Sequence, residues 1–307
     1  MITTYFRTVK DDTLKTLTAF RSGVWVHAES PNEQEMARLV AELGVDETIL
    51  EDATDFFEVP RLERSEGITY FFTRYPYEQS EEDAETAPLL IAVGESFVLT
   101  VSLHPVPQFA AFTNGTQVVH TTQKTKLFIQ LMQAITASFE RQLIRLRRAV
   151  HKDRAKLRKI GNREIVRFVG YEHKLNDMIA AVLPTNTALQ QVLGGGYIQV
   201  YDDDRELVED LRIDNAQVVD SARTLLKTIQ NVRSAAEAIL TNNLNNRIKT
   251  LTVLTVLLTV PTIISSLFGM NVALPLAEAP FAFVYIVLFV AVVVALMVWY
   301  FKRHEWF

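Results

Sequence analysis

The chain has 307 residues, of which 49% are hydrophobic and 22% are charged, and its formal net charge is −5. These averages describe a soluble protein of about two domains. The sequence has no cysteine, which excludes disulfide bonds and thiolate metal sites and fits a reducing compartment. The N-terminal stretch MITTYFRTVKDD has no apolar segment of signal-peptide length, so we expect the N-terminal part not to be exported.

The charge is distributed unevenly along the chain. No Asp, Glu, Lys or Arg occurs between Thr250 and Ala277, and the 21 residues from Phe281 to Phe301 are also uncharged. A helix needs about 20 apolar residues to cross the hydrocarbon core of a bilayer. We therefore predict two transmembrane helices, at about 250–270 and at 281–301, with a connection at 271–280 and a basic tail at 302–307.

The residues that flank these spans predict their orientation. Arg247 and Lys249 precede the first span, Lys302 and Arg303 follow the second, and the connection carries only Glu278. Basic residues near the ends of a span are retained on the cytoplasmic side. We therefore expect a protein of the cell (inner) membrane with both termini and the N-terminal part in the cytoplasm.

The expected fold class is an α+β cytoplasmic domain followed by long helices and two C-terminal transmembrane helices. Within it, residues 1–120 read as a cytoplasmic mixed α/β domain. In SPNEQEMARLVAELG, Ser30 and Glu33 fit a capping box and Gly44 fits a helix stop. No phosphate-binding glycine loop, metalloprotease His pair or nucleophile elbow occurs in this part, which argues against an enzyme. Strands are predicted in three runs with β-branched and aromatic residues, GVWVHA, GITYFFTRY and LLIAVGESFVLTVSL.

Residues 121–200 read as a cytoplasmic layer of long helices. Ten Lys or Arg residues fall between Arg141 and Arg163. Such a run can indicate nucleic-acid binding, but the chain as a whole is acidic and no aromatic residues interleave the charges. We interpret the run as a solvated helix face and expect no nucleic-acid partner.

The glycines of LGGGYIQVYDDD end this helical layer, because three successive glycines disfavour a helix interior. A second long helix is predicted to begin near Asp203 or Asp204 and contains no proline until Pro261. We expect the segment 201–270 to be a stalk helix that continues into the first span. About 65 helical residues would extend about 100 Å.

Polar residues recur along the first span at intervals of three, four, three and four residues, which is the spacing of a seam in a left-handed helical bundle. The hydroxyl groups of such residues can bond back to their own helix or join neighbouring helices. We favour a third interpretation, in which symmetry-related copies of the stripe enclose a polar pathway. The residues are Thr252, Thr255, Thr259, Thr262 and Ser266, and the same spacing reaches Asn245 before them and Gly269 after them.

Four sequence features together resemble the CorA family of divalent-cation channels. The Gly-Met-Asn signature of that family occurs here as FGMN at the end of the first span. The stretch ILEDATDFFEVPRLERSEGITYFF resembles the family's cytoplasmic Leu-Glu-Asp, Arg-Pro-x-x-Glu stretch, although Val59 stands where Arg usually precedes the proline. NNLNNRIKTLTVLT resembles the start of the family's pore helix, and FKRHEWF resembles its basic, aromatic C-terminus.

The resemblance implies a funnel-shaped homopentamer whose first spans line a pore and whose second spans form an outer ring. It implies that Gly269, Met270 and Asn271 form the mouth and that Asn245 is a polar position at the inner end. Family members often use bulky apolar residues as gates, so Thr259 departs from the pattern. Leu251 and Leu258 are the candidate gate residues here.

The function implied is entry of hydrated Mg²⁺ into the cytoplasm, driven by membrane potential without a nucleotide. Mg²⁺ sheds its water reluctantly, so neutral oxygens suit it better than carboxylates that would trap it. One alternative is a relative that carries Zn²⁺, Co²⁺ or Ni²⁺, with or without protons. An alternative of another class is a membrane-anchored scaffold or sensor, which leaves the hydroxyl stripe unexplained.

The family also holds its closed state with Mg²⁺ bound between the cytoplasmic domain of one subunit and the stalk of the next. Two acidic clusters in this chain, around 78–85 and 202–210, are candidates for such a site. The alternative is that they are solvated acids that bind no metal, favoured in the second cluster by the dipole at a helix N-terminus. The residues we expect to bind regulatory Mg²⁺ are Asp83, Glu209 and Asp210.

Overall fold

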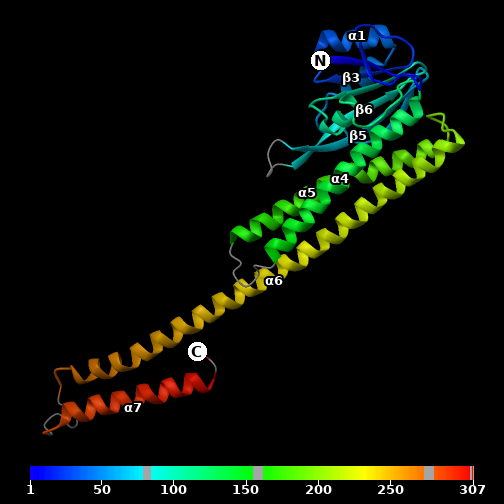
Figure 1. The fold of residues 1–307 in the computed structure, drawn as a ribbon. Helices are drawn as coiled ribbons and strands as arrows, with labels where there is room; N and C mark the ends of the chain where they lie inside the picture. The colour runs from blue at the N-terminus through cyan, green and yellow to red at the C-terminus, as the bar shows by residue number, and fades with distance from the viewer. Residues whose placement is uncertain (79–83, 155–161, 273–279, 305, 307) are drawn as a thin grey trace. The chain divides into compact units, whose positions relative to one another are not determined.

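The computed structural model describes residues 1–78, 84–154, 162–272, 280–304 and 306 (Figure 1). Its N-terminal part is built on one sheet of seven strands in the order β2-β1-β3-β7-β6-β5-β4. β3 and β7 pair in parallel, and the other neighbouring strands pair antiparallel. The strands are β1 (Ile2–Phe6), β2 (Lys15–Leu17), β3 (Val24–Glu29), β4 (Leu62–Ser65), β5 (Ile68–Glu78), β6 (Ala84–Val93) and β7 (Phe97–Ser102).

Side chains alternate between the two faces of this sheet, as the period of two in a strand requires. On β5, Tyr70 and Phe72 join a core that also contains Leu39 and Leu50, from helices α1 (Glu33–Leu43) and α2 (Glu47–Asp52). The ring of Phe71 lies on the opposite face, 5.1 Å from the ring of Phe128 in a long helix. The predicted mixed α/β domain therefore has helices on both faces of its sheet.

The N-terminus of α1 differs from the predicted cap. Asn32, and not Ser30, is the N-cap: its side chain accepts the Glu35 N–H at 2.9 Å, and Glu35 accepts the Asn32 N–H at 3.1 Å. Ser30 instead donates its backbone N–H to the Ser102 carbonyl, at the end of the β3–β7 pair. The predicted helix stop is confirmed, because Gly44 has a left-handed φ of 66° that favours glycine.

Long helices follow the sheet, as the sequence predicted. After the short helices η1 (Pro107–Phe109) and α3 (Ala110–Thr113), helix α4 (Lys124–Arg154) and helix α5 (Asn162–Leu193) pack against each other and against β5 (Figure 1). The glycine run ends α5, and Gly195 has a φ of 79°. Helix α6 (Asp202–Phe268) then runs to the residue before Gly269, with Pro261 inside it, and α7 (Ala282–Arg303) follows.

The structure divides into two compact units, Met1–Val232 and Arg233–Phe307. The division falls inside α6, so the first unit contains the sheet and the long helices packed on it. The second contains the end of α6 and all of α7. The finer division into domains that was expected at residues 120, 200 and 270 stays a prediction.

We predict that Asn32→Ala lowers the free energy of unfolding by about 1 kcal/mol, because it removes the N-cap bond of α1. Glu33→Ala, which removes the capping partner expected from sequence, should cost less than half as much. Thermal unfolding of the purified chain in detergent, followed by circular dichroism, measures both. Equal losses would show that Asn32 does not cap the helix.

Candidate ion pathway

Two helices are long and apolar enough to cross a membrane, α6 through its C-terminal part and α7. Almost no residue in the apolar part of either helix is buried, and α7 has no buried residue at all. A core helix of a soluble protein would instead hide such residues inside the fold. These exposed apolar surfaces therefore require a lipid environment or other helices around them.

The end of α7 has the composition of a membrane interface. Trp299 and Tyr300 are exposed, and the Arg303 guanidinium carbon lies 5.4 Å from the centre of the Trp299 ring. Lys302 and Arg303 form the basic last turn of the helix. Aromatic residues gather at the level of lipid headgroups, and basic residues reach beyond them to water.

The threonines of the predicted stripe all bond to their own helix. Each hydroxyl donates to the carbonyl four residues earlier, in the pairs Thr252–Ile248, Thr255–Leu251, Thr259–Thr255 and Thr262–Leu258, at 2.7–2.9 Å. A hydroxyl has one proton to donate and two lone pairs that accept. The lone pairs therefore remain available on an exposed surface, while the donors are already used.

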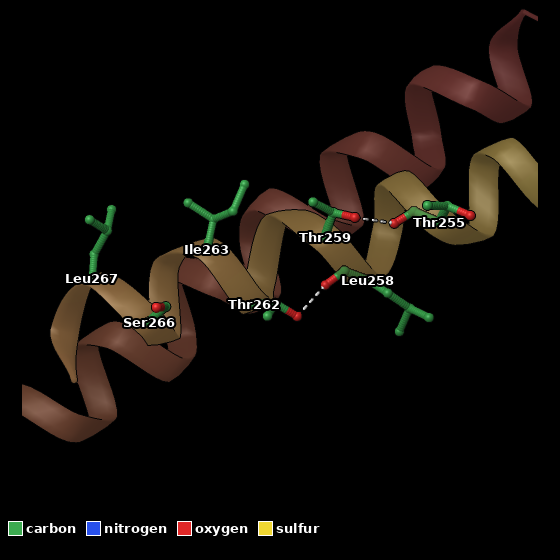
Figure 2. A pocket seen from close by; sticks show the side chains of 7 residues that line it. All are labelled: Thr255, Leu258, Thr259, Thr262, Ile263, Ser266 and Leu267. Atoms are coloured by element: carbon green, nitrogen blue, oxygen red, sulfur yellow. Dashed lines mark hydrogen bonds between the residues drawn. The ribbon is translucent and has the colours of Figure 1, made fainter. Parts of the chain in front are cut away.

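Part of this stripe lines a hollow of about 510 Å³ on α6 (Figure 2). All of its lining residues come from the one helix, so a single chain provides only one wall. Leu258, a predicted gate residue, lies beside the threonines, whereas Leu251, Thr252 and Asn245 fall outside the hollow. The lining residues are Thr255, Leu258, Thr259, Thr262, Ile263, Ser266 and Leu267.

Ile263 and Leu267 were not among the predicted pathway residues. They follow Thr262 and Ser266 directly and are four residues apart, which places them at the edge of the same helical face. The polar spacing alone could not include them. Helical geometry applied to the apolar neighbours of the stripe would have found them.

The predicted mouth lies directly after α6. The Gly269 N–H donates to the carbonyls of Ser265 and Ser266, at 3.0 and 3.2 Å, and so closes the last turn of the helix. The Met270 N–H reaches the Leu267 carbonyl at 3.4 Å, and the Met270 side chain is exposed. Asn271 is exposed as well, and no hydrogen bond of its side chain occurs within the described residues.

The predicted regulatory residues are not brought together in the described residues. Asp83 lies outside them, and they contain no group of three or more His, Cys, Asp or Glu that could hold a metal ion. Both oxygens of Glu209 accept hydrogen bonds from Arg212, at 2.6 and 3.0 Å, which lowers the pKa of that carboxyl. Asp210 is exposed.

The family model described as the CorA-like Mg²⁺ transporter protein matches residues 21–303, nearly the whole chain. The chain belongs to this CorA-like family. The predicted resemblance is therefore confirmed, and the chain is a member of a family of divalent-cation transporters.

Individual proteins also resemble this chain over most of its length. The cobalt/magnesium transport protein CorA of Methanocaldococcus jannaschii is 24% identical over 290 residues, which cover 92% of this chain and 91% of that protein. The complete structure of the CorA magnesium transporter from that organism matches with a TM-score of 0.87 at 21% identity, covering 100% of this chain and 99% of that one. The ZntB cytoplasmic domain from Vibrio parahaemolyticus covers 78% of this chain, with a TM-score of 0.63 at 8% identity. These likenesses confirm the predicted fold class of the chain.

We predict that Thr255→Val or Thr262→Val reduces divalent-cation flux by about fivefold while the purified protein keeps its stability and oligomeric state. Valine keeps the shape of threonine but removes the acceptor oxygen, and a lost hydrogen bond costs about 1 kcal/mol. Flux into liposomes that contain the purified protein measures the effect.

Thr250→Val is the matched control, because Thr250 makes the same bond to its own helix, to the Asn246 carbonyl at 3.0 Å. It lies five residues before Thr255, on the opposite side of the helix. If the stripe variants keep full flux and instead dissociate the protein, the threonines join helices and line no pathway.

Proposed function

We propose that the chain is a homopentameric channel that admits hydrated Mg²⁺ to the cytoplasm under the membrane potential. The observation that carries this proposal is the hydroxyl stripe of α6, which is exposed on a membrane-spanning helix and already bonded to its own backbone. Several copies of α6 around one axis would turn this one-sided wall into a polar pathway.

The chemistry of the stripe suits a hydrated cation. Water molecules bound to Mg²⁺ direct their oxygens to the metal and their protons outward, so they need acceptors around them. The stripe offers acceptor oxygens because its protons are directed to backbone carbonyls. Neutral oxygens can bond these waters without stripping them from an ion that loses water reluctantly.

The absence of charge along the pathway favours passage over trapping. No Asp, Glu, Lys or Arg occurs from Thr250 to Ala277, so no carboxylate on this face would hold a divalent ion in place. A divalent ion gains about 4.6 kcal/mol per 100 mV, twice the value for one charge. This gain can drive entry without a nucleotide.

The mouth is proposed at Gly269, Met270 and Asn271. Five connections would bring five Asn271 side chains around one axis, where their amide oxygens accept bonds from the waters of an arriving ion. Gly269 follows the last turn of α6 and lets the chain leave the helix. Asn245 is proposed as the polar position at the inner end.

Closure is proposed to use apolar side chains that dewet the pathway. Leu251 and Leu258 lie seven residues apart on α6 and are both exposed. This spacing puts them on one side of the helix, next to the hydroxyl stripe. We propose that they form the gate.

The orientation proposed places both termini and the unit Met1–Val232 in the cytoplasm, with the cell (inner) membrane around the end of α6 and α7. The basic residues on the outer sides of the two spans support it, as does the connection without Lys or Arg.

Co²⁺ is a second candidate ion. The M. jannaschii relative is named a cobalt/magnesium transport protein and matches 92% of this chain. Co²⁺ has the same charge as Mg²⁺, and a pathway that contacts only bound water discriminates weakly between such ions. Comparing Mg²⁺, Co²⁺, Ni²⁺ and Zn²⁺ in the same liposomes, with imposed potentials and pH gradients, separates the candidates and detects proton coupling.

We predict that Asn271→Ala abolishes Mg²⁺ flux into liposomes while the assembled protein remains in the membrane. The change removes the amide oxygens proposed to receive the hydrated ion. Asn245→Ala should cause a smaller loss, because the stripe still provides acceptors beyond it. Wild-type flux through the Asn271 variant would show that this side chain does not receive the ion at the mouth.

Cytoplasmic Mg²⁺ is proposed to regulate the channel by binding acidic side chains. Repulsion among exposed acids can be relieved by a hard cation with oxygen ligands. Arg212 already provides such relief at Glu209, so a metal there would have to displace a two-bond ion pair. Asp210 has no ion pair within the described residues and is the better donor on α6.

We predict that Asp83→Asn, Glu209→Gln and Asp210→Asn together raise the internal Mg²⁺ concentration needed for half-inhibition by about tenfold, which corresponds to about 1.4 kcal/mol. Patch recordings at varied internal Mg²⁺ measure this. The control neutralises three exposed acids outside the two clusters, Glu33, Glu47 and Asp214. An unchanged inhibition curve for the first triple variant would show that these acids are solvated surface residues that bind no regulatory Mg²⁺.

A further inference from the structure

The segment between α2 and β4 exposes two apolar side chains on the unit Met1–Val232. Phe57 is 81% exposed and Val59 is 59% exposed. Acidic residues flank them, since Asp55 and Glu58 lie on either side of Phe57 in the chain. We call the segment 55–59 the aromatic knob.

Arg74 on strand β5 holds the backbone of the knob by hydrogen bonds. One guanidinium nitrogen of Arg74 donates to the carbonyls of Phe56 and Glu58, at 2.9 and 2.7 Å, so it binds the backbone on both sides of Phe57. The other nitrogens of Arg74 bond Thr86 on the neighbouring strand, at 2.9 and 2.6 Å. The backbone around Phe57 is thus tied to the sheet.

A second arginine and an aspartate complete this support. Arg61 lies over the ring of Phe72, with its guanidinium carbon 4.1 Å from the ring centre, and forms ion pairs with Glu58 and Asp52. The Asp55 carboxylate accepts the Phe57 N–H at 2.9 Å. The exposure of Phe57 therefore does not come from a loosely held loop.

A rigid, exposed aromatic side chain is well suited to binding. Burial of a phenylalanine contributes about 1.5–3 kcal/mol. A group already held in its binding conformation avoids most of the entropy cost of ordering it. A single exposed apolar residue is common on protein surfaces, so the complementary surface decides whether the knob has a partner.

The same chain carries a surface of opposite charge on α4. Ile144 is 47% exposed there and lies among arginines at helical spacings of three and four residues. Within the described residues, Arg141 and Arg148 have no carboxylate at ion-pair distance. We call this the basic face of α4, and it comprises Arg141, Ile144, Arg147, Arg148 and Lys152.

We propose that the aromatic knob of one copy docks on the basic face of α4 of the next copy. Phe57 would contact Ile144, with the guanidinium groups of Arg141 and Arg148 over its ring, and the Asp55 carboxylate would pair with one of them. The proposal rests on the self-assembly proposed above and names the surfaces that join the subunits.

Both surfaces lie toward the same end of β5 and α4. Thr69 of β5 and Thr125 of α4 both bond the segment before α6, at the carbonyls of Tyr197 and Gln199, at 2.6 and 2.8 Å. Phe71 and Phe128 meet further along, so β5 and α4 run in the same direction. Both surfaces lie beyond that contact. Two different surfaces on one unit form a heterologous contact, which closes into a ring when the rotation permits.

The test uses the absence of native cysteine. We expect the double variant Phe57→Cys with Ile144→Cys, in detergent and treated with a short bismaleimide, to form a ladder of covalent oligomers up to the full ring. Each single variant should remain a monomer on a denaturing gel, because like surfaces do not meet. Phe57→Cys with Val166→Cys is the matched control, since Val166 is apolar and 70% exposed on α5.

Three results would overturn the proposal: dimers from Phe57→Cys alone, equal cross-linking in the Val166 control, or no ladder from a double variant that native mass spectrometry shows to be oligomeric. A wild-type chain that is monomeric and carries no ion flux would instead contradict the proposed function. Arg141→Glu with Arg148→Glu should raise the concentration for half-dissociation at least tenfold. Lys126→Glu, which is exposed on the same helix but 18 residues and about 27 Å before Ile144, should not.

Discussion

The hydrogen bond from each threonine hydroxyl to the carbonyl four residues earlier is the interaction on which the proposed ion pathway depends. An unpaired hydroxyl proton on a helix in lipid would be costly, because the hydrocarbon offers no acceptor. The bonds of Thr255, Thr259 and Thr262 remove that cost without a second helix. They also determine how the surface can hydrogen-bond, since only the acceptor lone pairs of the hydroxyls remain available. A stripe that is stable in lipid is therefore already suited to the protons of a hydrated cation.

Features encoded by local periodicity could be predicted from the sequence. The uncharged runs gave both candidate spans, and the glycine run and the missing prolines gave α6 with its start within two residues, at Asp202. The spacing of the threonines placed them on one face, but spacing says nothing of hydroxyl orientation. The cap of α1 was misplaced because Ser30 is held by the pairing of β3 with β7, a contact between residues far apart in the sequence.

Long-range contacts limited the rest of the prediction. Nothing near Phe57 in the sequence indicates that Arg74 reaches back from β5 to bind the carbonyls on both sides of it. The acids of α6 formed a visible cluster, yet Arg212 lies one helical turn from Glu209 and engages its carboxylate. The pairing of a carboxylate with an arginine three residues away is a local pattern that is visible in the sequence, and it favours Asp210 over Glu209 as a candidate metal ligand.

The one-sided hollow links transport to assembly. Its lining residues all come from α6, so in the proposed channel other copies would supply the remaining walls. In lipid, apolar helices gain little from meeting one another, and helix association relies on close packing and on hydrogen bonds between helices. The stripe has already used its donors, so it contributes little to holding copies together. In the proposed pentamer, most of the association energy would then come from surfaces in water, where burial of apolar area is favourable. The unit Met1–Val232 offers such a surface in Phe57, on a backbone fixed before any partner arrives.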